Sequence, residues 1–140
     1  MKYTIEHVEL DGSTFEELVE LDYECFPYDA RMSFSGTRWW LATDEDGKAV
    51  AYAGLEHRYG DRGFLCRAGV LPEARGNGLQ KRLIRARERG ARSLSMDRLI
   101  TYTDKHNVVS SNNLIACGYR LYRPEDEWGT PAALYWYRDL

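Results

Sequence analysis

The sequence predicts an α/β fold (α+β mixed) in which a mixed sheet carries helices on its faces. Strand-like runs joined by turn signals dominate the first half of the chain, and a strand–helix–strand unit follows them. Hairpins give antiparallel neighbours, whereas a crossover helix requires parallel ones, so the sheet must be mixed. A chain of 140 residues fits one core, and we expect a single domain over residues 1–140.

The first quarter of the chain predicts one strand and one helix. Residues 3–9 alternate in polarity and are rich in β-formers, which indicates a strand. Ser13 to Glu16 has the pattern of a capping box, in which a hydroxyl and a carboxylate satisfy the free amides of a helix start. Apolar residues follow at helical spacing until Pro27 ends the helix.

The middle of the chain predicts three strands and a second helix. Asp46-Gly47 is a strong hairpin signal, and residues 59–63 look like a further turn. Pro72 closes the last of these strands, and apolar residues at helical spacing predict a helix over residues 78–92. The expected strands are 38–43, 49–55 and 64–71.

The last third of the chain predicts a strand over residues 99–103 and a short helix over residues 110–117. Gly118 is a natural C-cap for that helix. Two final strands are expected at residues 119–122 and 133–138.

Composition and charge exclude several functional classes. An isoelectric point near 5.6 argues against nucleic acid as the main partner. No apolar run approaches the roughly 18 residues of a membrane span, and the N-terminus lacks a secretory pattern, so we expect no membrane partner and a cytoplasmic location. The three cysteines and three histidines lack metal-ligand or disulfide spacing, and we expect no metal.

Charge is distributed unevenly along the chain. Residues 1–60 hold 5 Lys and Arg against 13 Asp and Glu, whereas residues 61–140 hold 14 against 9. This asymmetry suggests that the second half handles an anion and that the first half faces something cationic, although solvated faces would give the same count.

The stretch from Val70 to Ile84 carries the most chemical information. A strand stops at Pro72, a loop brings Gly76 and Gly78, and a basic amphipathic helix begins at once. A helix start offers free N–H groups and partial positive charge, and glycine lets a ligand approach the backbone closely. Pyrophosphate is the expected ligand. The Walker pattern and the full Gly-x-Gly-x-x-Gly are both missing, and a plain loop without a ligand is the alternative.

Arg75-Gly76-Asn77-Gly78-Leu79-Gln80 resembles the acetyl-CoA loop of the GNAT superfamily of N-acetyltransferases, Arg/Gln-x-x-Gly-x-Gly/Ala after a Val-x-Pro strand end, with Gln80 in place of the last small residue. Asn107 through Gly118-Tyr119 has the spacing of a second family block, an Asn, a short helix and Gly-Phe/Tyr. The resemblance implies a GNAT-like central twisted sheet, mixed but mostly antiparallel, of about 6–7 strands flanked by about four helices.

The resemblance also implies roles for single residues. The main chain of Val70 and Leu71 would pair with the pantetheine arm, and Asn107 would bond it, with a helix cap as the alternative or additional role. The side chain of Gln80 would either reach a phosphate or crowd the site. The pyrophosphate would be wrapped by Arg75, Gly76, Asn77, Gly78, Leu79 and Gln80.

Acylation of an amine requires its neutral form, and an alkylamine with a pKa near ~10.4 is almost fully protonated at neutral pH. A general base is therefore expected. Glu56, at the end of a strand, is the first candidate, unless it is a solvated turn residue. The other candidates are His57, Asp104 and His106.

The leaving thiolate needs only modest help, because a thiol pKa is near ~8.5. Many family members place a tyrosine about five residues before the Gly-Phe/Tyr pair, where it can act as the acid. Leu114 stands there in this chain. Tyr102 and Tyr119 are the candidate substitutes, and solvent is the alternative.

These patterns predict an N-acetyltransferase that uses acetyl-CoA as cosubstrate and transfers the acetyl group directly to a primary amine of a small molecule or protein. The family also suggests a homodimer as one assembly. Two alternatives remain, a catalytically inactive acyl-CoA-binding sensor and a phosphate-loop protein for nucleotides. Aromatic residues would line the acceptor pocket or fill the sheet core, and acidic ones would attract a cation: Trp39, Trp40, Trp128, Tyr135, Trp136 and Tyr137, with Asp44, Glu45 and Glu127.

Overall fold

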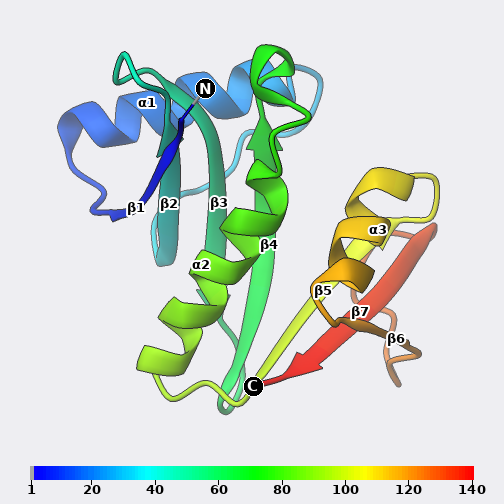
Figure 1. The fold of residues 1–140 in the computed structure, drawn as a ribbon. Helices are drawn as coiled ribbons and strands as arrows, with labels where there is room; N and C mark the ends of the chain where they lie inside the picture. The colour runs from blue at the N-terminus through cyan, green and yellow to red at the C-terminus, as the bar shows by residue number, and fades with distance from the viewer. Residues whose placement is uncertain (1) are drawn as a thin grey trace.

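The computed structural model describes residues 2–140, which form one twisted seven-stranded sheet (Figure 1). The strand order is β1-β2-β3-β4-β5-β7-β6, and every neighbouring pair is antiparallel except β4 and β5. The predicted fold class is therefore confirmed. The strands are β1 (Thr4–Val8), β2 (Thr37–Thr43), β3 (Ala49–His57), β4 (Arg62–Val70), β5 (Arg98–Asp104), β6 (Arg120–Tyr122) and β7 (Ala133–Asp139).

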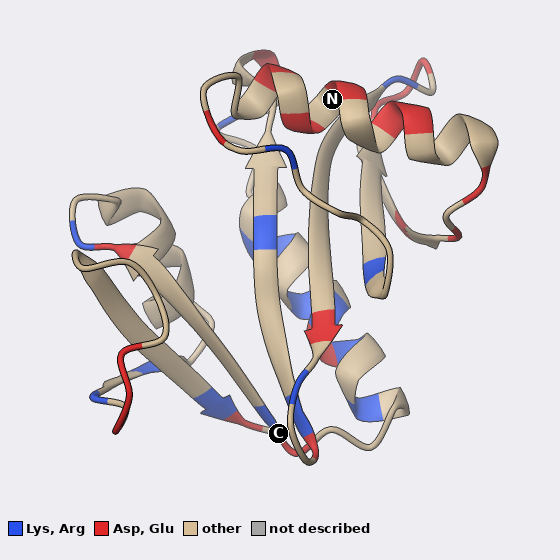
Figure 2. Cartoon of the chain, turned by 180° about the vertical axis from the view of Figure 1, so that it is seen from behind, with Lys and Arg blue, Asp and Glu red and all other residues tan. Residues whose placement is uncertain are grey.

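Three α-helices and one short 3₁₀ helix flank the sheet. α1 (Gly12–Cys25) covers one face of the β1–β4 half, and α2 (Leu79–Ser93) covers the opposite face of that half (Figures 1 and 2). α3 (Val108–Ala116) lies on the same side as α2, over β5 and β7 (Figure 1). The 3₁₀ helix η1 (Pro72–Ala74) lies between β4 and α2. Apolar side chains of α1 pack on β3 and β4, those of α2 pack on the opposite face of β2, β3 and β4, and this packing makes the core.

The capping box predicted at the start of α1 is wrong. The helix begins at Gly12, and its N-cap is Asp11, whose side chain makes no capping bond. Ser13 already lies inside the first turn, so its hydroxyl is not at the position that receives the free amides. The predicted end is confirmed, because the C-cap is Phe26, directly before Pro27.

β4 and β5 separate soon after they meet. They pair in parallel only from Arg62 to Phe64, opposite residues 98–100 of β5. Figure 1 shows the two strands diverging from this point toward the end of the sheet where α3 begins. The divergence creates the space in which the site described below is built.

A buried carboxylate ties α2 to the second half of the sheet. Glu88 of α2 is 1% exposed and accepts hydrogen bonds from Arg138 Nη1 at 2.6 Å and Tyr119 Oη at 2.9 Å. Arg85 Nη1 donates to its other oxygen at 2.8 Å. Because Arg138 belongs to β7 and Tyr119 directly precedes β6, Glu88 fixes the orientation of these strands relative to α2. Within the described chain, no helix has the length and apolar character needed to cross a membrane.

Candidate active site in the cleft between β4 and β5

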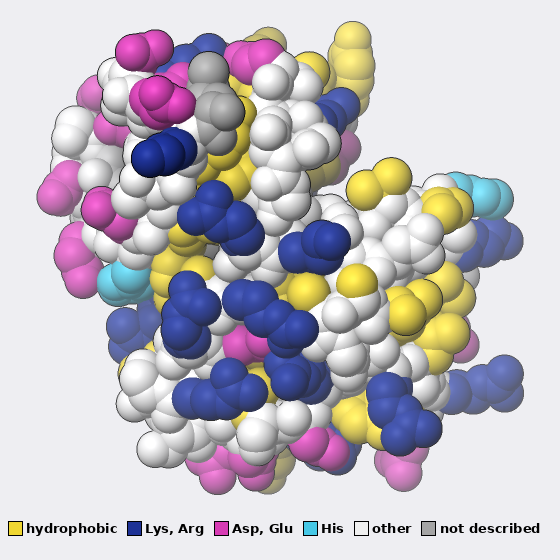
Figure 3. All heavy atoms as spheres, viewed as in Figure 1, with side chains coloured by type: hydrophobic (Ala, Val, Ile, Leu, Met, Phe, Trp, Pro, Cys, Tyr) yellow, Lys and Arg dark blue, Asp and Glu magenta, His cyan; other side chains and the backbone are white. Residues whose placement is uncertain are grey.

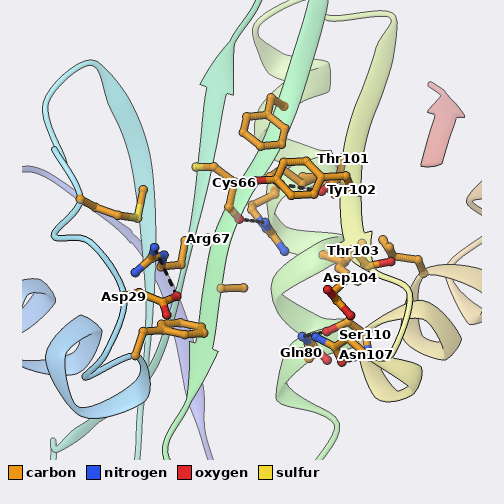
Figure 4. A pocket seen from close by; sticks show the side chains of 18 residues that line it. Asp29, Cys66, Arg67, Gln80, Thr101, Tyr102, Thr103, Asp104, Asn107 and Ser110 are labelled. Carbon is orange, nitrogen blue, oxygen red and sulfur yellow. Dashed lines mark hydrogen bonds and ion pairs between the residues drawn. The ribbon is translucent and has the colours of Figure 1, made fainter. Parts of the chain in front are cut away.

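Two adjoining cavities occupy the space where β4 and β5 diverge. The loop cavity, about 570 Å³, lies against the glycine loop and the start of α2. The inter-strand cavity, about 450 Å³, lies deeper between the facing sides of β4 and β5 (Figure 4). Both are bordered by Phe26, Ala68, Gln80, Asn107 and Ser110, so they form one continuous cleft.

The glycine loop has the backbone that its sequence requires. Gly76 and Gly78 have φ angles of +79° and +71°, in the left-handed region that side chains disfavour. A Cβ at either position would meet no atom within 4 Å, so the space beside both glycines is open. The loop therefore leaves room for a ligand to approach its backbone.

The start of α2 presents unused hydrogen-bond donors. Arg82 N–H donates to Gly78 O at 3.1 Å and makes the first bond of the helix. The N–H groups of residues 78–81 donate to no acceptor within residues 2–140. Gly78 is the N-cap and supplies no side chain to satisfy them. Free donors at a helix start, together with the helix dipole, are the geometry that anion binding requires.

The side chains of the loop brace it and add positive charge. Asn77 Nδ2 donates to Ala74 O at 2.9 Å and to Arg75 O at 3.2 Å, which holds the turn closed. Arg75 and Lys81 both border the loop cavity, whereas Leu79 is buried and anchors the helix start in the core. The loop is thus braced by side-chain hydrogen bonds, cationic and open on its ligand side.

Only one of the two residues predicted to bind a pantetheine arm faces the cleft. Leu71 N–H donates to Val50 O at 2.9 Å, so its amide points toward β3 and away from the cavity. Alternation along the strand turns the polar backbone groups of Val70 to the other side. There Val70 O accepts a hydrogen bond from Arg75 Nε at 3.1 Å. Leu71 therefore does not present its amide to the cleft as expected. The strand register decides which way each backbone amide points, and the register was not visible in the sequence.

Gln80 crosses the cleft instead of blocking the loop. Its Nε2 donates to Ser110 Oγ at 3.1 Å, and its Oε1 accepts from Asn113, so the side chain bridges α2 and α3. Asn107 is the N-cap of α3, with Oδ1 accepting from Ser110 N–H at 3.1 Å. The capping role read from the sequence is confirmed. Both Gln80 and Asn107 border both cavities.

Of the four candidate bases, Asp104 is the one that borders the inter-strand cavity. Its Oδ1 accepts the backbone N–H of His106 at 2.8 Å, which fixes the carboxylate at the end of β5. Glu56 lies on β3, pairs with Arg58 at 3.2 Å and lines neither cavity. The side chains of His57 and His106 also lie outside the lining of both cavities.

The two candidate acids are in different environments. Tyr102 borders the inter-strand cavity and stacks on Phe64, with ring centroids 6.1 Å apart. Tyr119 is 3% exposed and donates to Glu88, and burial raises its pKa above the ordinary value. The structure does not bring Tyr119 to the cleft, because the residue lies in the core outside both cavities. Leu114 does line the inter-strand cavity and offers no proton.

The cysteines near the cleft are protonated. Burial raises the pKa of Cys66, which borders the inter-strand cavity, and of Cys25, which borders the loop cavity, to about 11 each. A thiolate is the reactive form of cysteine, so neither residue is prepared to act as a nucleophile near neutral pH.

The predicted aromatic pocket is mostly core. Trp39, Trp40, Tyr135 and Trp136 are buried. Trp128 is half-buried and packs edge-on against Phe64 and Tyr102, which border the cleft. The acidic candidates line neither cavity: Asp44, Glu45 and Glu127.

Arg87 is a cleft residue that was not predicted. It lies in the apolar stripe of α2 formed by Leu79, Leu83 and Ala91, and it borders the inter-strand cavity. The signal was present, because a charged residue at position i+4 from Leu83 interrupts a stripe that otherwise packs on the sheet. Figure 4 shows Thr101 and Tyr102 of β5 on one side of this space, whereas Arg67 of β4 extends toward Asp29 on the other.

The two helix surfaces carry opposite charge. Acidic residues are spaced along α1 (Figure 2), and basic side chains gather on the face that α2 presents (Figure 3). The basic residues on the exposed side of α2 are Lys81, Arg82, Arg85, Arg89 and Arg92. The uneven charge of the two halves of the sequence therefore becomes a cationic surface beside the glycine loop.

Known proteins share both the sequence pattern and the fold. The model of the acetyltransferase (GNAT) family matches residues 5–119, whereas no curated protein matches the chain. The solved Bacillus subtilis acetyltransferase in complex with CoA is 16% identical with a TM-score of 0.79, and the match covers 99% of both chains. The PaiA N-acetyltransferase from Thermoplasma acidophilum in complex with coenzyme A is 14% identical with a TM-score of 0.79 over 100% of both chains.

A third similar structure is the ribosomal-protein-S18-alanine N-acetyltransferase from Escherichia coli. It is 14% identical with a TM-score of 0.77, and the match covers 99% of this chain and 94% of that one. At such identities the structural matches establish the fold.

Proposed function

The chain belongs to the GNAT family of acetyl-CoA-dependent acyltransferases, and from that premise we propose that it transfers an acetyl group directly to a primary amine of a small molecule or protein. The observation that carries the proposal is the row of free N–H donors at residues 78–81, beside two glycines with open space. Acetyl-CoA brings to this site a diphosphate for those donors and a thioester as the acyl source.

The loop residues fit the diphosphate. Backbone donors of residues 78–81 and the charges of Arg75 and Lys81 all border the loop cavity. Aligned donors at a helix start bind an anion without reorganisation, and glycine at positions 76 and 78 keeps the approach open. Gln80 leaves its own N–H available because its side chain is held by α3.

The pantetheine arm would run along β4 toward the inter-strand cavity. Val70 turns its backbone into the cleft, and Asn107 stands on the opposite side. We assign these two residues, and not Leu71, to hold the arm. The side-chain oxygen of Asn107 keeps its capping bond to the Ser110 N–H, while the side-chain nitrogen Nδ2 stays free to donate.

Asp104 is the base that the geometry favours. During transfer, the amine nitrogen bonds the acyl carbon, the carbon–sulfur bond breaks with its electron pair leaving on sulfur, and the amine loses a proton. Asp104, which is fixed by the His106 N–H, takes that proton directly or through water. Tyr102 lies beside it along β5 and is the remaining hydroxyl candidate for returning a proton to sulfur.

Direct transfer is preferred to a route through an acyl-cysteine. Cys66 is the thiol that borders the inter-strand cavity, and its pKa of about 11 keeps it protonated near neutral pH. An acyl-enzyme route requires an activated nucleophile. Substitution of Cys66 by alanine should therefore leave transfer intact apart from its effect on packing.

Calorimetry with acetyl-CoA, CoA and ATP tests the cofactor assignment. We expect binding of the first two, and tight ATP binding without CoA binding would instead support a phosphate-loop protein for nucleotides. Incubation of acetyl-CoA with polyamines, amino acids, aminoglycosides and peptides, followed by assay of free thiol and acetylated product, tests the reaction.

Leu114 is the observation that favours a catalytically inactive acyl-CoA-binding sensor. It occupies the wall of the inter-strand cavity where an acid would be useful, and Tyr119 is sequestered by Glu88. Acetyl-CoA binding with no thiol release above background across the whole amine panel would favour this second function.

A further inference from the structure

Arg87 is a buried cation without a counter-charge. It lies in the middle of α2, and its exposed fraction is 2%. Charged side chains rarely lie that deep unless an opposite charge accompanies them. Within residues 2–140, the hydrogen-bond partners of Arg87 are three carbonyl oxygens and no carboxylate.

Counting the donors of Arg87 shows that one nitrogen is unused. A guanidinium carries five N–H donors. Nε donates to Leu83 O at 3.2 Å, and Nη1 donates to Gly54 O at 3.1 Å and to Cys66 O at 3.3 Å. Nη2 therefore has no acceptor. Every enclosed side-chain nitrogen and oxygen in the described part of the chain has a partner, so Nη2 must border open space, and Arg87 borders the inter-strand cavity.

The adjacent acid does not neutralise Arg87. Glu88 follows it in the helix but points to the other side, where its two oxygens accept from Arg85, Tyr119 and Arg138. Burial lowers the pKa of Arg87, yet an arginine keeps its proton because its ordinary pKa lies above ~12. The cavity thus has a permanent positive charge on its wall.

The other charged groups of the cavity are already engaged. Arg67 donates to the buried Asp22 at 3.0 Å and pairs with Asp29 at 3.7 Å, and Asp104 accepts the His106 N–H. The titratable residues that border the cavity besides Arg87 are Asp29, Cys66, Arg67, Tyr102 and Asp104. Of the two arginines that border the cavity, Arg67 has carboxylate partners, whereas Arg87 has none within residues 2–140.

We propose that Nη2 of Arg87 stabilises the negative charge that forms on the reacting thioester, an inference that rests on the proposed acyl transfer. Charge builds on the carbonyl oxygen as the amine nitrogen bonds the acyl carbon. It moves to sulfur when the carbon–sulfur bond breaks. At each stage one atom carries it. A guanidinium with one free nitrogen suits a single anionic atom, whereas a carboxylate pairs with two nitrogens.

The place of Arg87 in the cleft agrees with this role. The glycine loop holds the phosphate end at the loop cavity, and the inter-strand cavity continues inward from there. The thiol end therefore reaches the cavity whose wall Arg87 forms. Leu114 on the same wall has no proton to give, and a fixed cation lets a thiolate with an ordinary pKa near ~8.5 leave unprotonated at neutral pH.

Two variants and one control test the assignment. Arg87→Gln removes the charge, while its amide can still donate to a carbonyl of Gly54 or Cys66. Arg87→Lys keeps a charge that cannot serve both those carbonyls and the cavity. Arg89→Gln removes an exposed cation from the same helix and is the matched control. For each protein, the thiol of bound CoA is titrated by thiolate absorbance, and kcat and KM are measured with acetyl-CoA.

The two measurements distinguish stabilisation of charge on sulfur from stabilisation of charge on the carbonyl oxygen. A bound thiol pKa about one unit or more below that of free CoA, restored by Arg87→Gln but not by Arg89→Gln, assigns the charge to sulfur. A kcat about a hundredfold lower at constant KM, with no change in the thiol pKa, assigns it to oxygen. If folded Arg87→Gln changes neither quantity, the proposal is overturned.

Folding and function are controlled separately. Should Arg87→Gln fail to fold, as judged by circular dichroism, Arg87→Lys takes its place with smaller losses expected, and unchanged values overturn the proposal equally. The thiol titration needs no turnover. A natural protein that binds CoA but acetylates no amine would therefore count against the proposed function, while the thiol pKa still decides the role of Arg87.

Discussion

Thr101 Oγ1 donates a hydrogen bond to Leu65 O at 2.8 Å, directly beyond the last parallel pair of β4 and β5. Thr101 is buried, and both residues border the inter-strand cavity. The bond thus joins the two strands where they begin to diverge. It closes the deep end of the cleft and fixes the point from which the cavity opens.

Thr101→Val should lower the stability of the fold, because it deprives Leu65 O of this donor with little change in side-chain volume. The expected loss in free energy of unfolding is about 1–3 kcal/mol. Urea denaturation measures it. Thr130→Val, at an exposed position, is the control and should change stability by less than about 0.5 kcal/mol. Equal stability of the two variants would contradict the structural role of the Thr101 bond.

Gly78→Glu should weaken acetyl-CoA binding at least about tenfold, because a carboxylate at the helix start opposes the diphosphate and its side chain fills the approach. Calorimetry with acetyl-CoA measures the affinity. Gly60→Glu is a matched control, since Gly60 also has a positive φ, +69°, and open space beside it but lies in the β3–β4 turn. Unchanged affinity in a folded Gly78→Glu protein would show that the glycine loop does not bind acetyl-CoA.

Asp104→Asn should reduce kcat/KM about a hundredfold with any amine that the natural protein acetylates, because the amide cannot take a proton. The asparagine oxygen can still accept the His106 N–H, so the end of β5 should keep its shape. Steady-state kinetics across neutral pH provides the readout. Glu56→Gln is the comparison. A larger loss of kcat/KM in Glu56→Gln than in Asp104→Asn would identify Glu56, on β3, as the base.

Glu88→Gln should change how the stability of the fold depends on pH. Burial alone would raise the pKa of Glu88, but the hydrogen bonds from Arg138, Arg85 and Tyr119 outweigh it and hold the pKa below its ordinary value. A carboxyl with a depressed folded pKa contributes stability above its unfolded pKa, near ~4.3, and loses that contribution as pH falls through the lower folded value.

Thermal unfolding from pH 7 to pH 3 tests this expectation. The natural protein should lose stability at the acid end, and Glu88→Gln should be less stable at pH 7 by about 3 kcal/mol but show a shallower acid decline. Parallel curves for the two proteins would show that the carboxylate is not the group responsible. Glu125→Gln, at an exposed position in the β6–β7 connection, controls for the loss of one negative charge.

The elements with strong local signals were predictable from the sequence. Asp46-Gly47 marks the β2–β3 turn, where Gly47 has a φ of +81°. Gly118 ends α3 with a φ of +90°, and the N–H of Tyr119 returns to Leu114 O as such a cap requires. These features depend on a few adjacent residues, so their pattern is visible without tertiary structure.

The catalytic side of the site was less predictable. Glu56 and Asp104 are both acidic residues at strand ends, and the sequence does not say which strand end borders the cleft. Tyr119 carries a hydroxyl that could act as a general acid, but the fold turns this hydroxyl toward Glu88. Arg87 was overlooked because a charge in an apolar stripe gains meaning only when its surroundings are known.

The sequence by itself determined the glycine loop, the helix behind it and the order of the elements, because backbone conformation there follows from glycine, proline and apolar spacing. Tertiary structure alone decided which side chains share the cleft. Strand register turned Leu71 toward β3 and Val70 toward the cavity, and the divergence of β4 from β5 brought Arg87, Asp104 and Tyr102 to one space. Such placements depend on contacts between residues far apart in the chain, which local patterns do not encode.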